Sequence, residues 1–198
     1  MLVDGSGTPA RPGSVLVRGD RVEAVLGPAG SEPPVDRRYD AGGRLVAPGF
    51  VDVHQHSDVT PFVEPGMDSM LRQGVTSVVV GNCGGSAFPF EGAREHAAMA
   101  GADVEDLGLA RWTTFAGYLE AIDRARPALN VAALVGHGTL RQDALGLADR
   151  TPTPDELQAM RRTLAGAVDE GAVGMSSGLI YVPGLHASTE ELDRKSVV

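Results

Sequence analysis

The chain has 198 residues, of which 42% are hydrophobic and 22% charged, a composition typical of a globular protein that buries a sizeable core. Its formal net charge of -9 argues against nucleic acid or an anionic membrane as a partner, because an acidic surface repels both. There is no apolar run near the roughly 20 residues of a membrane span, and no basic and apolar leader. The single cysteine, Cys83, excludes an internal disulfide and indicates a reducing, cytoplasmic compartment.

The opening segment contains a predicted β-hairpin. Residues 14–26 form two short apolar-rich stretches around Gly19-Asp20, a pair that suits a tight turn. A loop rich in Gly, Pro and Ser follows over residues 28–34, and residues 44–46 predict another short strand. These pieces make a small β unit that cannot close a core by itself.

Two histidines follow the next predicted strand. Pro48-Gly49 marks a turn, and the apolar run over residues 50–53 predicts a strand that is buried on both faces, as in a parallel sheet. Because side chains alternate along a strand, His54 and His56 share a face and can converge on one metal ion. Imidazole nitrogen suits a divalent cation. The His-x-His pattern alone is weak, and polar residues at a strand end are the plainer interpretation.

A helix and a second strand come next. Apolar residues at helical spacing predict a helix over residues 67–73 that ends at Gly74, and the β-branched run over residues 75–80 predicts a buried strand. A strand, a helix and a strand with short joints make a βα unit, the repeat of a parallel barrel. Cys83 follows this strand directly, within a glycine-rich run. A lone cysteine is more often a small buried hydrophobe than a ligand.

Two helices are predicted in the middle of the chain. The first covers residues 91–99, with His96 expected on its exposed surface. The second covers residues 112–124, where Thr113 or Thr114 can act as the N-cap of an apolar face.

Two further strands are predicted around a long helix. Residues 130–135 predict a third buried strand, and His137 lies in the loop at its end, where a histidine bonded to backbone is one interpretation and a pocket residue another. Thr153 begins the clearest helix in the chain, with a proline and a glutamate placed for a capping box, and Gly171 marks its end. Residues 172–175 predict a fourth strand.

Two of these segments carry a resemblance. Val46-Ala-Pro-Gly-Phe-Val-Asp-Val-His-Gln-His56 resembles the first barrel strand of the amidohydrolase superfamily, whose members are metal-dependent hydrolases. The Gly81-Asn-Cys-Gly run resembles one branch, the N-acyl-D-amino-acid deacylases, in which a cysteine takes the metal-bridging place of a carboxylated lysine. The resemblance implies that His54, His56 and Cys83 bind one or two Zn²⁺ ions. Consistently, the only lysine is Lys195, near the end of the chain.

The resemblance also implies the fold. We expect an α/β protein in which residues 47–192 form an incomplete (β/α)8 TIM-like barrel, about the first four βα units, preceded over residues 1–46 by the N-terminal part of a small β-sandwich domain. A complete barrel needs about 250 residues, so the chain is expected to be an N-terminal fragment with open sheet edges that favour aggregation. Residues 193–198 depart from the pattern and are expected to be a non-native tail.

The implied activity is hydrolysis of the amide bond of a small N-acyl-D-amino acid, giving a carboxylate and a free D-amino acid. The resemblance places His137 in the pocket and Tyr181 in contact with substrate, where the plainer interpretation is an ordinary half-buried tyrosine. The general-base aspartate and further histidine ligands are expected outside this chain, which is therefore expected to be inactive. A cyclic-amide hydrolase of the dihydroorotase or hydantoinase type and a non-catalytic binding domain of the same fold are the alternatives.

Overall fold

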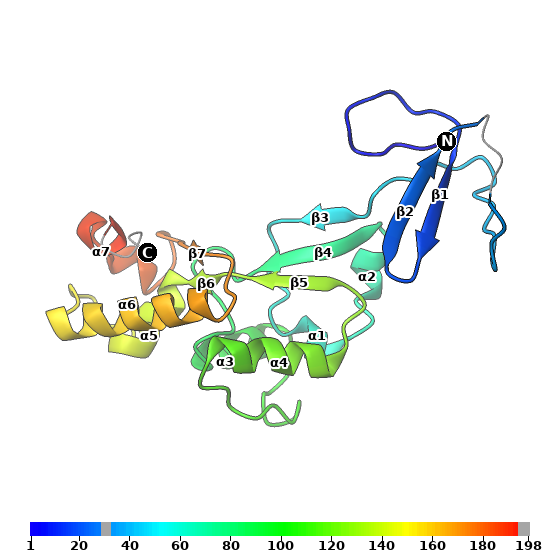
Figure 1. The fold of residues 1–198 in the computed structure, drawn as a ribbon. Helices are drawn as coiled ribbons and strands as arrows, with labels where there is room; N and C mark the ends of the chain where they lie inside the picture. The colour runs from blue at the N-terminus through cyan, green and yellow to red at the C-terminus, as the bar shows by residue number, and fades with distance from the viewer. Residues whose placement is uncertain (29–32, 194–198) are drawn as a thin grey trace. The chain divides into compact units, whose positions relative to one another are not determined.

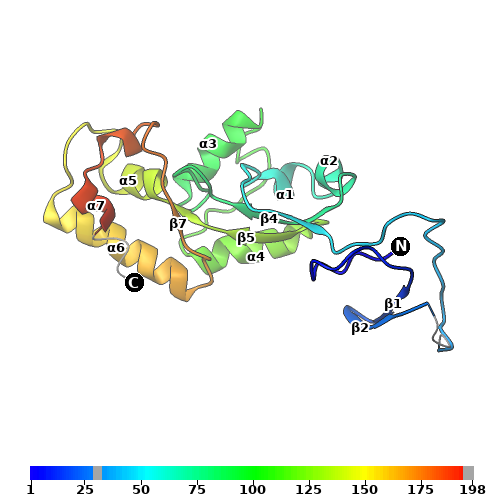
Figure 2. The same cartoon turned by 90° about the horizontal axis from the view of Figure 1, so that it is seen from above.

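The structure, a computed structural model, describes residues 1–28 and 33–193 (Figures 1 and 2). The chain divides into two compact units, Met1–Gly49 and Phe50–Val198. Of the expected non-native tail, only Asp193 lies within the described residues. The assignment of residues 1–46 to a sandwich domain and of residues 47–192 to a barrel stays a prediction.

The first unit contains the predicted hairpin. Strands β1 (Ser14–Arg18) and β2 (Arg21–Leu26) pair in antiparallel fashion, and Gly19 takes a φ of 60° at the turn between them. The strand predicted over residues 44–46 is reduced to a single bridge between Val46 and Leu2. Leu2 is buried, whereas most large apolar side chains of the hairpin are exposed. The unit is therefore held mainly by backbone pairing.

The second unit has α/β architecture, as predicted. Its elements in chain order are β3 (Phe50–Asp52), α1 (Thr60–Val63), α2 (Asp68–Leu71), β4 (Val75–Val80), α3 (Glu91–Met99), α4 (Phe115–Ala125), β5 (Asn130–Ala133), β6 (Val135–Gly136), α5 (His137–Leu145), α6 (Pro154–Asp169), β7 (Met175–Ser176), the 3-10 helix η1 (Gly184–His186) and α7 (Thr189–Asp193). Strands β3, β4 and β5 form one parallel sheet in that order, and β6 pairs with β7, also in parallel. Among the described residues, parallel strands therefore alternate with helices along the chain, as the predicted βα repeats require.

The strand predicted over residues 130–135 is divided between these two sheets. Leu134 N still donates to Val80 O at 2.9 Å, but Val135 N donates to Gly174 O at 2.9 Å. The change of partner occurs because β4 ends at Val80, beyond which Gly81 turns away with a φ of 80°. The fourth strand is shorter than predicted, because Gly174 adopts a φ of 148° and extended pairing begins only at Met175.

The core lies on one face of the three-stranded sheet. Val78 and Val80 of β4 are buried in a cluster that includes the aromatic side chains of α4, and Figure 1 shows α3 and α4 on the same side of the sheet. Phe50 and Val51 of β3 are 61% and 59% exposed. The prediction that this first strand is buried on both faces is therefore wrong. It lies at the edge of the described sheet, while the helices pack beneath β4 and β5.

The helix predicted over residues 91–99 and the capped helix predicted from Thr153 are confirmed as α3 and α6. The helix predicted over residues 112–124 begins only at Phe115, and the one predicted over residues 67–73 is reduced to the single turn of α2. The N-caps of α4 and α6 can now be assigned. Thr114 Oγ1 accepts a hydrogen bond from Gly117 N at 3.0 Å, so Thr114 rather than Thr113 caps α4. Thr153 and Glu156 form the predicted capping box of α6. No helix in the described parts of the chain is long and apolar enough to cross a membrane.

The two threonines before α4 provide a matched test of this cap. Thr114→Ala is expected to lower the free energy of unfolding by about 1 kcal/mol, because it removes the hydrogen bond to Gly117 N. Thr113→Ala should have little effect, since the Thr113 hydroxyl bonds to no residue that the structure describes. Urea denaturation of both variants measures the difference. Equal losses would contradict the assignment.

The capping box also predicts a dependence of stability on pH. Hydrogen bonds from Arg150 and from the backbone of Thr153 lower the pKa of Glu156 from 4.5 to about 2. Because the folded pKa is depressed, the contribution of this carboxylate is complete above 4.5 and is lost as the pH falls towards 2. The stability advantage of wild type over Glu156→Gln should therefore shrink over this range in acid denaturation. Asp155→Asn, at the exposed neighbouring acid, controls for loss of charge alone.

Candidate metal centre

The segment that carries the two histidines leaves the sheet earlier than predicted. Strand β3 ends at Asp52, so His54 and His56 lie in the following loop and strand alternation does not place them. The Asp52 carboxylate orders this loop by accepting hydrogen bonds from the Gln55 side chain and from His54 N. These two bonds, the Gln55 bond foremost, hold the pKa of Asp52 below its ordinary value. Gln55 N in turn donates to Val79 O of β4 at 3.1 Å.

Cys83 lies in a tight turn directly after β4. Cys83 and Gly84 have φ angles of 55° and 79°, and Gly85 N donates to Asn82 O at 3.0 Å, the pattern of a turn with both central residues left-handed. For a residue with a Cβ this conformation costs about 1–2 kcal/mol. The surrounding structure must therefore hold the turn in place.

Close backbone packing holds this turn from two sides, the link between β5 and β6 and the segment that includes β7 and Gly178. A Cβ on Gly81 would lie 2.2 Å from Leu134 O, and one on Gly178 would lie 1.9 Å from Cys83 O, so only glycine fits at either position. Ser176 Oγ donates to Gly81 O at 2.5 Å and accepts from Gly84 N at 3.0 Å. Backbone contacts with Leu134 and Gly178 and hydrogen bonds with Ser176 thus fix the Cys83 turn.

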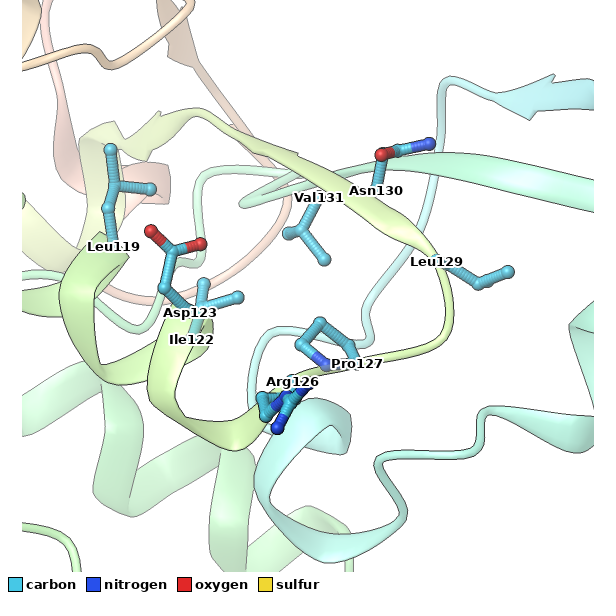
Figure 3. A pocket seen from close by; sticks show the side chains of 8 residues that line it. All are labelled: Leu119, Ile122, Asp123, Arg126, Pro127, Leu129, Asn130 and Val131. Atoms are coloured by element: carbon cyan, nitrogen blue, oxygen red, sulfur yellow. The ribbon is translucent and has the colours of Figure 1, made fainter. Parts of the chain in front are cut away.

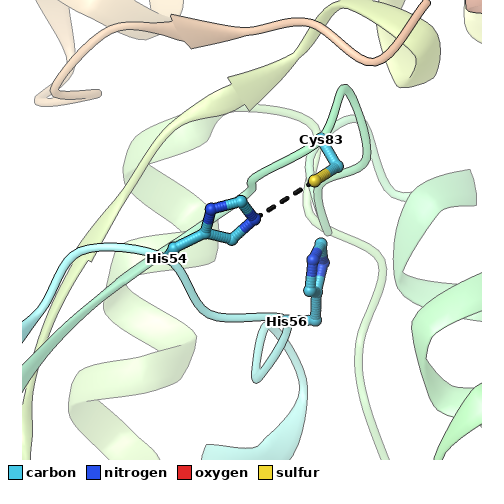
Figure 4. Close-up of side chains that lie close together, drawn as sticks. All are labelled: His54, His56 and Cys83. Carbon is cyan, nitrogen blue, oxygen red and sulfur yellow. Dashed lines mark hydrogen bonds between the residues drawn. The ribbon is translucent and has the colours of Figure 1, made fainter. Parts of the chain in front are cut away.

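The structure brings His54, His56 and Cys83 together (Figure 4). His54 Nε2 lies 3.2 Å from Cys83 Sγ, the two imidazole centroids are 5.5 Å apart, and one ligand atom from each residue lies within 4.8 Å of the others. A tetrahedral Zn²⁺ ion with ordinary bond lengths needs its ligand atoms about 3.3–3.6 Å apart. Both imidazoles are exposed and can rotate, so the nitrogen and sulfur donors fit such an ion after a small contraction.

A buried carboxylate that the sequence did not indicate, Asp58, lies two residues after His56. Asp58 is 1% exposed; its Oδ1 accepts from Ala87 N at 3.3 Å, and its Oδ2 lies 3.6 Å from His96 Nδ1. Burial raises the pKa of Asp58, and the nearby His96 imidazole partly opposes that rise. The Tyr118 hydroxyl donates to the main-chain oxygen of Asp58 at 3.0 Å. Asp58 therefore anchors the histidine loop to the core.

The prediction that His96 is a surface residue is wrong. Its exposed fraction is 6%, because α3 turns Ala93, His96 and Ala97 toward the core. These residues have the spacing of one helix face, and the small size of alanine hid the apolar stripe.

His137 is buried within a cluster of charged side chains. It is the first residue of α5 rather than a loop residue, and Thr139 N in the first turn of that helix donates to Gly84 O at 3.1 Å. His137 Nε2 lies 2.8 Å from Glu191 Oε1, and Arg141 Nη1 donates to Glu191 Oε2 at 2.5 Å. The spacing of His137 and Arg141 on one helix face was the available signal for this cluster. His137 is not in the group formed by His54, His56 and Cys83.

Tyr181 lies in the connection between β7 and η1. Its backbone N donates to Gly178 O at 3.3 Å, and Gly178 packs against the Cys83 turn. Tyr181 is 54% exposed, which agrees with the plainer interpretation of a half-buried tyrosine. The loop that carries Tyr181 contacts the Cys83 turn, while about half of the residue stays open to solvent.

A surface hollow lies elsewhere on this unit. Its volume is about 520 Å³ and it is bounded by the end of α4 and the start of β5 (Figure 3). Its lining residues are Leu119, Ile122, Asp123, Arg126, Pro127, Leu129, Asn130 and Val131. It sits at the beginning of a strand, whereas catalytic groups in parallel α/β folds gather at strand ends. We assign no chemistry to it.

Known proteins are similar to this chain in sequence and in fold. Residues 37–196 match the amidohydrolase family. The chain is 46% identical to N-acyl-D-glutamate deacylase of Alcaligenes xylosoxydans xylosoxydans, over 97% of this chain and 38% of that protein. A solved D-aminoacylase, studied for its binuclear metal centre, superposes with a TM-score of 0.85 and 41% identity over 96% of this chain and 40% of that one.

A second solved structure is that of N-acyl-D-glutamate deacylase from Bordetella bronchiseptica, complexed with zinc and a phosphonate mimic of the tetrahedral intermediate. It superposes with a TM-score of 0.82 and 40% identity over 98% of this chain and 40% of that one. The chain thus spans about 40% of the length of these relatives.

The buried cluster around Glu191 predicts a large effect on stability. Glu191→Ala should lower the free energy of unfolding by about 3–5 kcal/mol, because it leaves the buried Arg141 guanidinium without its carboxylate. The adjacent Glu190→Ala, at an exposed position, is the control and should change stability far less. Urea denaturation followed by circular dichroism measures both. Similar losses in the two variants would show that Glu191 does not hold α7 in this way.

Proposed function

The chain belongs to the amidohydrolase family, and on this premise we propose that it carries the first metal-ligand set of an N-acyl-D-amino-acid deacylase. The observation that carries the proposal is the convergence of His54, His56 and Cys83, whose ligand atoms lie within 4.8 Å of one another after adjacent parallel strands. Deacylases of this kind share 46% and 41% identity with nearly the whole chain.

The proposed ligands supply suitable donors for zinc. Cys83 would bind as a thiolate and each histidine as a neutral imidazole, so binding would release the thiol proton. Zn²⁺ bound there would lower the pKa of a water molecule to about 7 and polarise an acyl carbonyl. Asp52 would keep the histidine loop ordered through its bonds to His54 N and to the Gln55 side chain.

We propose that the second unit corresponds to about the first four βα units of a (β/α)8 barrel, with the metal-ligand residues at the carboxyl ends of its strands. In support, β3, β4 and β5 are parallel and in sequential order, and β6 and β7 continue the pattern. The relatives are about 2.5 times as long as the part that matches, because the match covers 40% of their length. We propose that the general-base aspartate and the remaining ligands belong to the part of such proteins that this chain does not match.

The proposed substrate is a small N-acyl-D-amino acid, hydrolysed to a carboxylate and a free D-amino acid. Tyr181 is the proposed substrate contact, because its exposed phenol is carried by a loop that packs on the Cys83 turn. His137 has no exposed atoms, so its proposed part in the pocket is to support the strand end rather than to touch substrate. The acidic charge and the reduced Cys83 support a cytoplasmic enzyme without nucleic-acid or membrane partners.

Two alternatives have weaker support. A cyclic-amide hydrolase would use a carboxylated lysine, and the only lysine in the sequence is Lys195. A non-catalytic binding domain would not need three metal-type donors within reach of one ion. Neither alternative is favoured by a contact in the described chain.

Zinc binding by the 198-residue chain itself tests the ligand set. Calorimetric titration is expected to show Zn²⁺ binding in wild type and its loss in His54→Ala and Cys83→Ala. His186→Ala is the matched control, because His186 pairs with Asp149 outside the ligand group and should leave binding intact. Retention of binding in both ligand variants would refute the assignment.

Activity is tested on the product of the complete gene, with zinc present. Free D-glutamate or D-methionine should be released from the N-acetyl-D-amino acids, no product should form from the L-enantiomers, and Cys83→Ala should abolish the reaction. A chiral amino-acid assay measures each product. Hydrolysis of cyclic amides in place of acyl-D-amino acids would favour the alternative enzyme.

A further inference from the structure

We propose that Asn82 is a positioning residue that sets the Cys83 thiol relative to the two imidazoles. This inference rests on the proposed metal site and deepens it. Asn82 is adjacent to Cys83 in the chain, and its side chain reaches the segment between His54 and His56. It therefore links the two parts of the ligand set, which are far apart in sequence.

The Asn82 side chain makes two hydrogen bonds to backbone. Its Nδ2 donates to Val79 O at 2.8 Å and to Gln55 O at 3.3 Å. Both partners are carbonyl oxygens, so the amide must present its NH₂ group to them and not its oxygen. Asn82 is 9% exposed, and water therefore competes little for these bonds.

Val79 O is the point at which the two segments meet. It accepts one hydrogen bond from Gln55 N at 3.1 Å and another from the Asn82 side chain. The first bond fixes the histidine loop to β4, and the second fixes the start of the cysteine turn to the same atom. The direct bond from Asn82 to Gln55 O closes a small ring of contacts between the two ligand segments.

The Cys83 turn needs such an anchor because of its conformation. Cys83 has a φ of 55°, which a residue with a side chain adopts only when its surroundings impose it. Ser176 and Gly178 hold the turn from the side of β7. On the side facing the histidines, Asn82 supplies the hydrogen bonds, so its removal would release the turn from the histidine loop, while β7 and Thr139 N of α5 would still hold its other sides.

A cobalt(II) titration of the 198-residue chain tests this role. Cobalt takes zinc-type sites, and its absorption reports directly whether a thiolate is bound. Asn82→Leu keeps the branched shape of the side chain but removes both donors. We expect it to weaken cobalt affinity by about 10–100-fold and to lower the thiolate absorption per bound ion. Asn82→Ser, which keeps one donor, should show smaller losses.

Asn130→Ala is the matched control. Asn130 Nδ2 likewise donates to a backbone carbonyl of the neighbouring strand, Thr76 O at 2.9 Å, but at the opposite end of the sheet. It should leave cobalt affinity and thiolate absorption at wild-type values. Circular dichroism establishes that each variant is folded, and Asn82→Ser decides the question if Asn82→Leu does not fold.

The outcomes separate this inference from the proposed function. If the wild-type chain binds neither zinc nor cobalt, the proposed metal site fails. If wild type binds cobalt and the folded Asn82 variants retain its affinity and thiolate absorption, only the positioning role is overturned. Equal losses in the Asn82 and Asn130 variants would also overturn it, because they would reflect general destabilisation.

Discussion

Parallel pairing of β3 with β4 is the constraint on which the candidate site depends. The register places Phe50 opposite Val75 and Asp52 opposite Val78, so the carboxyl ends of both strands lie at the same end of the sheet. In an antiparallel pair, the two carboxyl ends would lie at opposite ends of the sheet. Because the pairing is parallel, short loops suffice to bring two imidazoles and a thiol into one small volume, with no long insertion to order.

Glycine residues make the close packing of the Cys83 turn possible. The turn after β4 packs so closely against Leu134 and against the segment after β7 that a Cβ at position 81 or 178 would overlap a carbonyl oxygen. The same closeness lets Ser176 bond to both sides of the turn. Steric exclusion thus fixes where the cysteine can be, and the hydrogen bonds with Ser176 fix how the turn is oriented.

Local sequence signals were sufficient for most elements of the fold. The hairpin, the helices over 91–99 and 154–169 and the strand over 75–80 follow from turn residues, caps and periodicity, which act over a few residues. Features set by distant contacts were not predictable. The exposure of β3 depends on which face the helices cover, and the division of the third strand depends on where its neighbour ends.

The candidate site shows the same division between local and distant information. His54, His56 and Cys83 could be selected from their residue types and from their places after predicted strands. Asn82 and Asp58 could not, because their roles rest on partners 27 and 29 residues away. A sequence identifies the groups able to bind an ion more readily than the amides and carboxylates that hold those groups in position.

Cys83 is the only thiol in the sequence, and it is partly accessible next to His54. An alkylating or fluorescent maleimide probe can therefore attach covalently at one place alone, and that place is the candidate metal centre. No other cysteine has to be removed by mutation before this chain is labelled. The fraction of chains that such a probe labels therefore measures the fraction of unoccupied sites, since a metal-bound sulfur is withdrawn from the reaction.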